Sequence, residues 1–267
     1  MSSDISLPFA ELERTVVDCA LLARGAQRGI KRSYKADGSV LTETDMRISH
    51  IIHDKVAQLF PDCSFVCEET EVERKDGRFI FVLDPIDGTD VYSQGLPSFA
   101  VALAMLDSQR RPVGALIAAP RFGIGREDLL VSLMPGGQLK VDGEVFHPEG
   151  DKDQVSQVTM GSNDQARIDF SHFSGKVRTF GSSIIHLIAP VVFSSMQGAV
   201  NQPSYVWDVA ASHAVLLAAG MDIEYCHGGR LEYTDDFLFG KKKYREDIYA
   251  GTPSAIRMMR SVLPLKD

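Results

Sequence analysis

The chain has 267 residues, of which 44% are hydrophobic and 24% are charged. This composition is typical of a globular protein and excludes a disordered chain, a collagen and a disulfide-rich scaffold. The 28 Lys and Arg against 36 Asp and Glu give a formal net charge of −8, which argues against a protein that binds duplex nucleic acid. A phosphorylated substrate stays compatible with this charge, because bound cations can reverse the sign of a local acidic site.

The first part of the chain predicts two amphipathic helices. Apolar residues recur at helical spacing within residues 7–30 and again within residues 48–59, where Pro61 ends the pattern. Thr44 or Asp45 is suited to cap the second helix. Two long antiparallel neighbours are expected.

Short runs rich in β-branched and aromatic residues follow the helices. They predict a sheet whose strands come from residues 64–67, 79–83, 99–106 and 113–118, with turns of a further meander at Gly136-Gly137 and Asp142-Gly143. The polar stretch 147–154 is the best boundary, which divides the chain into an N-terminal half, 1–150, and a C-terminal half, 151–267. In the second half we expect strands at 158–162, 176–181 and 247–250, and helices at 183–196, 207–219 and 253–263. Strands interleaved with helices in both halves indicate an α/β or layered α+β fold.

The four cysteines, Cys19, Cys63, Cys67 and Cys226, form neither a Cys-x-x-Cys pair nor a Cys/His zinc pattern. Reduced, structural thiols are expected. The first residues lack a basic start and an apolar signal core, and no run of about 18 apolar residues occurs anywhere. We therefore expect a cytoplasmic protein.

The segment 79–89 carries the strongest chemical signal. Its apolar first part predicts a buried strand that delivers Asp84 at its carboxyl end, where Pro85 should end the strand. Asp87 follows three residues later, so that two carboxylates face one point. Carboxylate oxygens, together with the backbone carbonyl of Ile86, suit the hard cation Mg²⁺.

Gly88 and Thr89 come directly after these acids, and their backbone N–H groups offer a site for an anion such as phosphate. Taken alone, Asp-Pro-x-Asp-Gly is more often a solvated turn whose aspartates bond to their own backbone. Three further features favour the functional interpretation. They are the pair Glu68-Glu69 after another apolar run, Asp208 after the only tryptophan, and the polar loop from Lys35 to Asp45.

In this order the segments resemble the inositol monophosphatase family, part of the lithium-sensitive, magnesium-dependent phosphatase superfamily. That superfamily also contains 3'(2'),5'-bisphosphate nucleotidases and fructose-1,6-bisphosphatases. The matching pieces are K-x-D-G-S-x-x-T-x-x-D from Lys35 to Asp45, the pair Glu68-Glu69, L-D-P-I-D-G-T, the Gly181-Ser182 turn, and W-D-V-A-A with A-G at the end of its helix at Gly220.

The resemblance implies a layered αβαβα fold, usually dimeric, that hydrolyses a small phosphomonoester with a metal-activated water and two or three Mg²⁺ per site. The metal ligands it implies are Glu68, Asp84, Asp87, Asp208 and the carbonyl of Ile86. Thr89 and Asp45, with Glu68, correspond to the catalytic residues that orient and deprotonate the water. Gly88, Thr89, Asp87, Asp208, Gly181 and Ser182 correspond to the residues that surround the substrate. The loop around Lys35, Asp37 and Ser39, with Glu69, resembles the mobile element that closes over the phosphate and helps to recruit a weaker metal.

Two departures bear on the substrate. Asp90-Val91-Tyr92 follows Thr89 and adds a negative charge near the phosphate end. The segment 201–205, before the tryptophan, lacks the acid with which relatives acting on inositol phosphates commonly accept hydrogen bonds from ring hydroxyls. Catalysis is therefore better supported than inositol specificity.

Several alternatives stay open. Within the enzyme class they are a nucleotidase acting on 3'-phosphoadenosine 5'-phosphate and a sugar bisphosphatase. Outside it is a catalytically silent phosphate-ligand sensor, and a third alternative is a phosphatase that uses Asp84 as a covalent nucleophile. Ser182 and Ser183 could line the leaving-group pocket or only cap a helix, and Lys241-Lys242-Lys243 could attract a phosphate or form a solvated loop.

Overall fold

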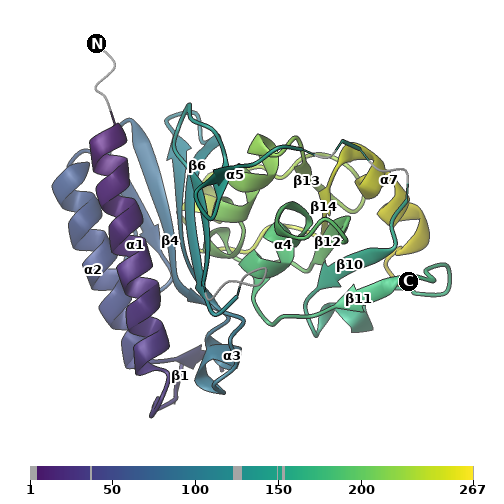
Figure 1. The fold of residues 1–267 in the computed structure, drawn as a ribbon, viewed down its shortest axis with the longest axis horizontal. Helices are drawn as coiled ribbons and strands as arrows, with labels where there is room; N and C mark the ends of the chain where they lie inside the picture. Colours follow the sequence, from purple (N-terminus) through teal and green to yellow (C-terminus); the bar gives the residue numbers. More distant parts are fainter. Residues whose placement is uncertain (1–4, 37, 123–127, 149, 152–153, 267) are drawn as a thin grey trace.

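A computed structural model describes residues 5–36, 38–122, 128–148, 150–151 and 154–266. Its elements form five layers, which Figure 1 shows edge-on as helices, sheet, helices, sheet and helix. The expected αβαβα arrangement is therefore confirmed. The helices of the layers are, in order, α1 (Ser6–Ala26) with α2 (Glu43–Leu59), α4 (Ser183–Val192) with α5 (Ala210–Ala218), and α7 (Pro253–Val262).

The outer layer of α1 and α2 buries one apolar stripe from each helix against the first sheet. The residue that caps α2 is Thr42, and the expectation of Thr44 or Asp45 at this position was wrong. Thr42 and Asp45 form a capping box, in which each side chain bonds to the backbone N–H of the other residue. Asp45 therefore lies in the first turn, with its carboxylate turned back toward the loop.

The first sheet has seven strands in the order β3-β4-β5-β6-β7-β8-β9. Among its described residues, β3 and β4 pair in parallel and all other neighbouring strands pair antiparallel. Both faces of its central strands are buried, and in β5 the alanines Ala100, Ala102 and Ala104 face α5 while larger residues face α1. Small side chains let a helix approach a sheet closely, since little volume has to be accommodated between them. The strands are β3 (Ser64–Cys67), β4 (Phe79–Asp87), β5 (Ala100–Asp107), β6 (Pro112–Pro120), β7 (Asp128–Leu133), β8 (Lys140–Val141) and β9 (Glu144–Val145).

Strand β4 continues through Pro85 to Asp87, so the expectation that the strand ends at Pro85 was wrong. Asp84 lies opposite Ala102 and Asp87 lies opposite Ala100. Strand β4 therefore has one more residue than β5 between these two pairs, which is a β-bulge. In a regular strand, residues three apart point to opposite faces. The bulge removes this difference, so that both carboxylates point to the same side of the sheet.

The second sheet has five strands in the order β11-β10-β12-β14-β13. The expected strands correspond to β10, β11 and β14, whereas β12 and β13 were not predicted. The expected helix at 207–219 was wrong at its start, because residues Val206–Asp208 form a 3-10 turn, η2, before α5 begins at Ala210. The strands are β10 (Gln157–Met160), β11 (Lys176–Arg178), β12 (Gly198–Asn201), β13 (Asp222–Tyr225) and β14 (Ile248–Gly251).

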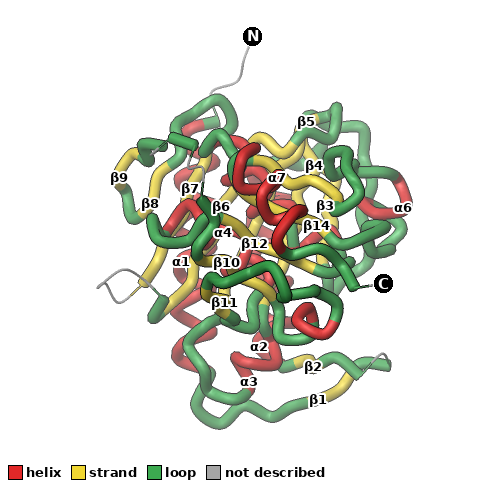
Figure 2. The backbone as a smooth tube through the Cα atoms, turned by 90° about the vertical axis from the view of Figure 1, so that its right-hand side faces the viewer, coloured by secondary structure: helices red, strands yellow, loops and turns green. Residues whose placement is uncertain are grey.

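Every strand of the larger sheet precedes the polar segment 147–154, and every strand of the five-stranded sheet follows it. Residues 149 and 152–153 of that segment lie outside the described part. Figure 2 shows the short hairpin of β1 (Ser33–Tyr34) and β2 (Val40–Leu41) next to α3 (Thr89–Ser93). The remaining short helices are η1 (Asp164–Ala166) and α6 (Asp235–Leu238). Across the described ranges, none of the helices is both long and apolar enough to cross a membrane.

Candidate active site

Three carboxylates from distant segments meet where β4 ends. Asp84 and Asp87 come from the bulge of β4, and Asp208 comes from η2, and one carboxylate oxygen from each lies within 4.8 Å of the others. Burial, and then the charge of neighbouring acids such as Glu68, raises the pKa of Asp84 and of Asp208 well above the usual range. Such a cluster is unfavourable without a compensating cation.

The donor atoms of this cluster fit a hard cation. Asp84 is 1% exposed, and its Oδ1 has no hydrogen-bond partner among the described residues. A buried carboxylate oxygen without a partner is costly, whereas Mg²⁺ takes such oxygens as ligands. The carbonyl of Ile86 lies between the two β4 aspartates in sequence and accepts a hydrogen bond from Thr89 Oγ1 at 2.8 Å.

Asp87 is held by the first turn of α4. Its Oδ2 accepts hydrogen bonds from the hydroxyl of Ser182 and, at 2.8 Å, from the N–H of Ile184. Ser182 is also the N-cap of α4, since its Oγ accepts from the N–H of Ile185 at 3.1 Å. Capping and contact with Asp87 are therefore two roles of one hydroxyl. Burial raises the pKa of Asp87 to about 6, against these hydrogen bonds, which lower it.

A hydrogen-bonded pair lies beside the cluster. The one hydroxyl proton of Thr89 is shared between the carbonyl of Ile86 and Asp45 Oδ1, which lies 3.2 Å from Thr89 Oγ1. The other Asp45 oxygen accepts from the backbone N–H of Thr42 at 2.9 Å. Asp45 is fully buried, and burial raises its pKa to about 6 although the Thr42 hydrogen bonds lower it. The capping box therefore orients one carboxylate oxygen toward the helix and leaves the other facing Thr89.

Glu68 and Glu69 follow β3 and lie beside the cluster because β3 pairs in parallel with β4. Lys35 joins them, with its Nζ at 2.6 Å from Glu68 Oε1 and 2.7 Å from Glu69 Oε1. The carboxylate of Glu68 thus contacts a lysine, while its charge still raises the pKa of Asp84 and Asp208. Burial, followed by the charge of Glu68, raises the pKa of Glu69 to about 7.

Gly88, at the start of α3, and Gly181, just before α4, lie against each other. Gly88 has φ +85°, and a Cβ on it would lie 3.0 Å from the carbonyl oxygen of Gly181. Gly181 also has φ +85°, and a Cβ there would lie 2.4 Å from Val91 Cγ1. Both positions require glycine for conformation and for space.

A cavity of about 450 Å³ opens over these groups. It is lined by Ser39, the three clustered aspartates, Glu68, Ile86, Gly88, Thr89 and Gly181, and also by Asp90, which adds the expected negative charge. Asp37 lies outside the described residues. Lys35 approaches the same region through its ion pairs, and its backbone N–H donates to the carbonyl of Ser39 at 2.9 Å.

Sequence reasoning missed several residues here. Arg32 and Tyr34 also line the cavity, and they directly precede the polar loop from Lys35 to Asp45, of which only Lys35, Asp37 and Ser39 were expected near the substrate. The triplet Lys241-Lys242-Lys243 was expected either to attract a phosphate or to form a solvated loop, and neither alternative included the contacts of Lys241, whose Nζ donates to the carbonyls of Glu68, at 3.1 Å, and Thr70, at 2.7 Å. Its positive φ of 48° marks a turn that no residue type at this position signals.

The segment before Asp208 has two aromatic side chains, Tyr205 and Trp207, and residues 201–205 contain no acid. Tyr205 stacks on Trp207 with centroids 4.8 Å apart, and the Lys243 ammonium lies 5.2 Å from the Tyr205 centroid. Asn201 is buried and donates to the hydroxyl of Tyr244 at 3.2 Å, so its side chain is used inside the protein.

Comparison with known proteins places the chain in a family. The profile of the inositol monophosphatase family matches residues 11–254. A 3'(2'),5'-bisphosphate nucleotidase, CysQ, of Escherichia coli is 26% identical over 247 residues, which cover 85% of this chain and 97% of the relative. An inositol-1-monophosphatase of Rhizobium meliloti is 25% identical over 209 residues, which cover 73% of this chain and 76% of the relative.

Solved structures share the fold. The staphylococcal inositol monophosphatase-1, in a complex described as inhibitory and soaked in 100 mM LiCl, superposes with a TM-score of 0.80 at 12% identity, over 98% of this chain and 96% of that one. The extragenic suppressor protein suhB of Bartonella henselae has a TM-score of 0.73 at 21% identity, over 97% of this chain and 96% of that one.

Proposed function

This chain belongs to the inositol monophosphatase family and is a phosphatase, and from that premise we propose that it hydrolyses a small phosphomonoester in a Mg²⁺-dependent reaction. The observation that carries the proposal is the convergence of Asp84, Asp87 and Asp208 within 4.8 Å, from segments more than 100 residues apart along the chain. Buried carboxylates that repel one another, with one oxygen that has no partner among the described residues, favour the binding of cations.

We propose that Glu68, Asp84, Asp87, Asp208 and the carbonyl of Ile86 hold two or three Mg²⁺ in each site. When bound, Mg²⁺ supplies the positive charge that lowers the pKa of a water molecule and neutralises the phosphoryl oxygens. For Glu68 to become a ligand, its ion pair with Lys35 has to open. Lys35, Asp37, Ser39 and Glu69 are then proposed to be the loop and neighbouring acid that close over the phosphate.

The proton of the attacking water passes through Thr89 and Asp45. In this proposal, Thr89 Oγ1 accepts a proton from water and gives its own proton to Asp45 Oδ1, so that the threonine ends neutral. The contact of 3.2 Å between these atoms supports the step. The N–H groups of Gly88 and Thr89 are proposed to bind the phosphate, with Gly181 and Ser182 on the side of the leaving group.

The two halves of the chain are proposed to contribute different parts. Residues 1–150 supply most of the metal ligands and the proton path, and residues 151–267 supply Asp208 and the leaving-group side. We also propose a homodimer and inhibition by lithium. The inhibitory LiCl complex of the staphylococcal relative supports the second of these.

A panel of phosphomonoesters, assayed for released phosphate with Mg²⁺ and with a chelator, tests the proposal. Inositol 1-phosphate, 3'-phosphoadenosine 5'-phosphate and fructose 1,6-bisphosphate represent the candidate classes. We expect release from at least one, only with Mg²⁺. Release that persists in the chelator contradicts metal dependence, and metal binding without turnover across the panel favours the silent sensor.

Variants at Thr89 test the proton path. Thr89→Val should lower kcat by about 10²- to 10⁴-fold because it removes the hydroxyl. Thr89→Ser keeps the hydroxyl and is the matched control, which should retain most of the activity. A phosphorylated Asp84 seen by rapid-quench mass spectrometry would replace this mechanism by the covalent one.

A bisphosphorylated nucleotide is the second candidate substrate. The stacked Tyr205 and the ammonium of Lys243 place aromatic surface and positive charge next to Asp208, where a substrate with a base and a second phosphate would benefit. Lys243→Met should lower kcat/KM for 3'-phosphoadenosine 5'-phosphate more than for inositol 1-phosphate. Lys242→Met is the control, because Lys242 pairs with Asp236 at the surface.

A further inference from the structure

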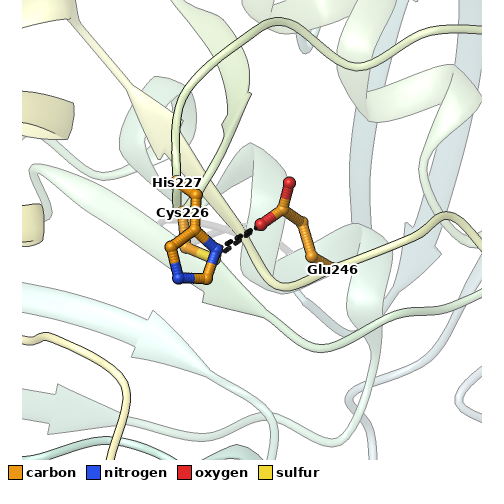
Figure 3. A group of neighbouring side chains, drawn as sticks. All are labelled: Cys226, His227 and Glu246. Atoms are coloured by element: carbon orange, nitrogen blue, oxygen red, sulfur yellow. Dashed lines mark hydrogen bonds and ion pairs between the residues drawn. The ribbon is translucent and has the colours of Figure 1, made fainter.

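A second group of metal-ligating side chains lies at the end of β13. Cys226, His227 and Glu246 each direct one donor atom to a common point, and Figure 3 shows the thiol, the imidazole and the carboxylate gathered there. Cys226 Sγ lies 3.2 Å from His227 Nδ1 and 3.3 Å from Glu246 Oε2, and His227 Nδ1 also bonds to Glu246 Oε2. None of these residues lines the cavity over the aspartates.

The backbone holds the two adjacent ligands in a tight turn. The N–H of Gly228 donates to the carbonyl of Tyr225 at 2.9 Å, so Cys226 and His227 occupy the central positions of a β-turn. Gly228, at φ +101°, allows the chain to reverse directly after His227. The N–H of Cys226 donates to the carbonyl of Asp247 at 2.8 Å, which brings the turn next to Glu246.

Two arginines fix the surroundings of the group. Arg245 Nε bonds to Glu246 Oε1 at 3.1 Å, which leaves Oε2 directed at the thiol and the imidazole. Arg260, from α7, donates to the carbonyls of Cys226, at 3.2 Å, and Tyr225, at 2.8 Å. The turn is thus positioned by contacts to its backbone, and the Glu246 carboxylate by a contact to the oxygen that does not face the thiol.

The geometry does not suit a nucleophilic Cys-His-Glu triad. In such a triad the histidine contacts the nucleophile with one ring nitrogen and the acid with the other. Here the thiol and the carboxylate both contact Nδ1. Burial, followed by Glu246, raises the pKa of the Cys226 thiol to about 11, which also makes it a poor nucleophile.

We propose that Cys226, His227 and Glu246 form a binding site for a thiophilic divalent cation of the Zn²⁺ class. One sulfur, one nitrogen and one oxygen donor suit Zn²⁺, with the fourth tetrahedral position open to water, whereas Mg²⁺ avoids sulfur. On binding, the thiol proton leaves to solvent and a metal–sulfur bond forms. The thiolate and the carboxylate then balance the charge of the ion. His227, whose side chain is 76% exposed, can turn to open the short contact with Glu246.

Cobalt(II) is the probe that separates this site from the acidic cavity. The reduced full-length protein, freed of metal by a chelator and then saturated with Mg²⁺, is titrated with Co²⁺. A thiolate ligand produces a charge-transfer band in the near ultraviolet, which carboxylates do not. We expect one Co²⁺ per chain to produce this band and Zn²⁺ to abolish it by displacement.

Variants assign the band. Cys226→Ser should abolish it, whereas Cys63→Ala, which removes another of the thiols, should keep it. His227→Ala and Glu246→Gln should raise the half-saturating Co²⁺ concentration, and Arg245→Gln should raise it by about 10-fold or more through loss of carboxylate positioning.

The proposal is overturned if the wild-type protein shows no band, if Cys226→Ser keeps it, or if His227→Ala binds as the wild type does. Because His227 is exposed, its variant keeps the test valid even where Cys226→Ser folds poorly. Phosphate release by His227→Ala in Mg²⁺ should equal that of the wild type. The experiments therefore distinguish failure of the proposed cation site from failure of the proposed phosphatase function.

Discussion

The hydroxyl of Ser182 donates a hydrogen bond to Oδ2 of Asp87, a residue 95 positions earlier in the chain. This contact links the bulge of β4 to the first turn of α4. The same hydroxyl caps α4. A proposed metal ligand is therefore oriented by a helix from the other half of the chain.

Ser182→Ala should lower both stability and Mg²⁺ affinity. Loss of an N-cap costs about 0.5–2 kcal/mol, and Asp87 also loses a hydrogen bond that orients it. Thermal melting and the half-saturating Mg²⁺ concentration of phosphate release measure the two effects. Thr252→Ala is the matched control, because Thr252 caps α7 through the N–H of Ala255. An equal shift of Mg²⁺ dependence in both variants would show that Ser182 acts only as a cap.

Asp84→Asn should stabilise the metal-free protein while it lowers kcat by about 100-fold or more. Its pKa is raised by burial and by neighbouring acids, so its charge opposes folding at neutral pH. An amide removes that charge. We expect a higher melting temperature in chelator, by about 2–4 °C for each kcal/mol.

Added Mg²⁺ provides the internal control for Asp84→Asn. It should raise the melting temperature of the wild type, because a ligand that binds only the folded state stabilises it, and should raise that of the variant much less. An equal Mg²⁺ shift in both proteins would remove Asp84 from the set of ligands.

Gly88→Ala should destabilise the protein more than Gly95→Ala. Both glycines have φ +85°, so both substitutions carry a left-handed backbone cost of about 1–2 kcal/mol. At Gly88 the added Cβ lies 3.0 Å from the carbonyl oxygen of Gly181, whereas at Gly95 it meets no atom of the described residues within 4 Å. The difference between their unfolding free energies in urea measures the close approach of the two halves. Equal values would mean that this approach adjusts without cost.

As the pH is lowered, the wild type should lose more stability than the His186→Gln variant. His186 is 1% exposed, and burial lowers its pKa to about 4; its Nε2 accepts the N–H of Phe180 at 2.7 Å. Between the unfolded pKa near 6.5 and the folded value, only the unfolded chain takes up the proton, so lowering the pH favours unfolding.

His186 therefore contributes about 3 kcal/mol to the free energy of unfolding above pH ~6.5, and this contribution is lost by pH ~4. Gln can accept the same N–H through Oε1 and does not titrate. Urea unfolding of both proteins between pH 7.5 and pH 4.5 gives the difference between their free energies of unfolding at each pH. The contributions of the acids that both proteins contain cancel in this difference. Parallel curves would show that His186 takes up its proton equally well in the folded state.

The sequence by itself predicted most of the helices and central strands and the acids of the candidate site, whereas the order of the layers was implied by the family resemblance. Apolar periodicity located α1, α2 and the central strands, because period and burial are local properties of the chain. The spacing of Asp84, Asp87, Gly88 and Thr89 at a strand end predicted a metal and phosphate site for the same reason. The strands β12 and β13 escaped prediction, because Gly198–Asn201 and Asp222–Tyr225 contain Gly, Ala, Asn, Asp and Glu, which are depleted in strands.

Tertiary structure decided what each of these groups contacts. The bulge that aligns Asp84 with Asp87 is a matter of register with β5, and no pattern within β4 reveals it. The bond from Ser182 to Asp87 and the meeting of Cys226 with Glu246 join residues that only sheet pairing and helix packing bring together. Local sequence sets backbone preference and burial, whereas such contacts depend on how complete layers pack, which is a property of the whole chain.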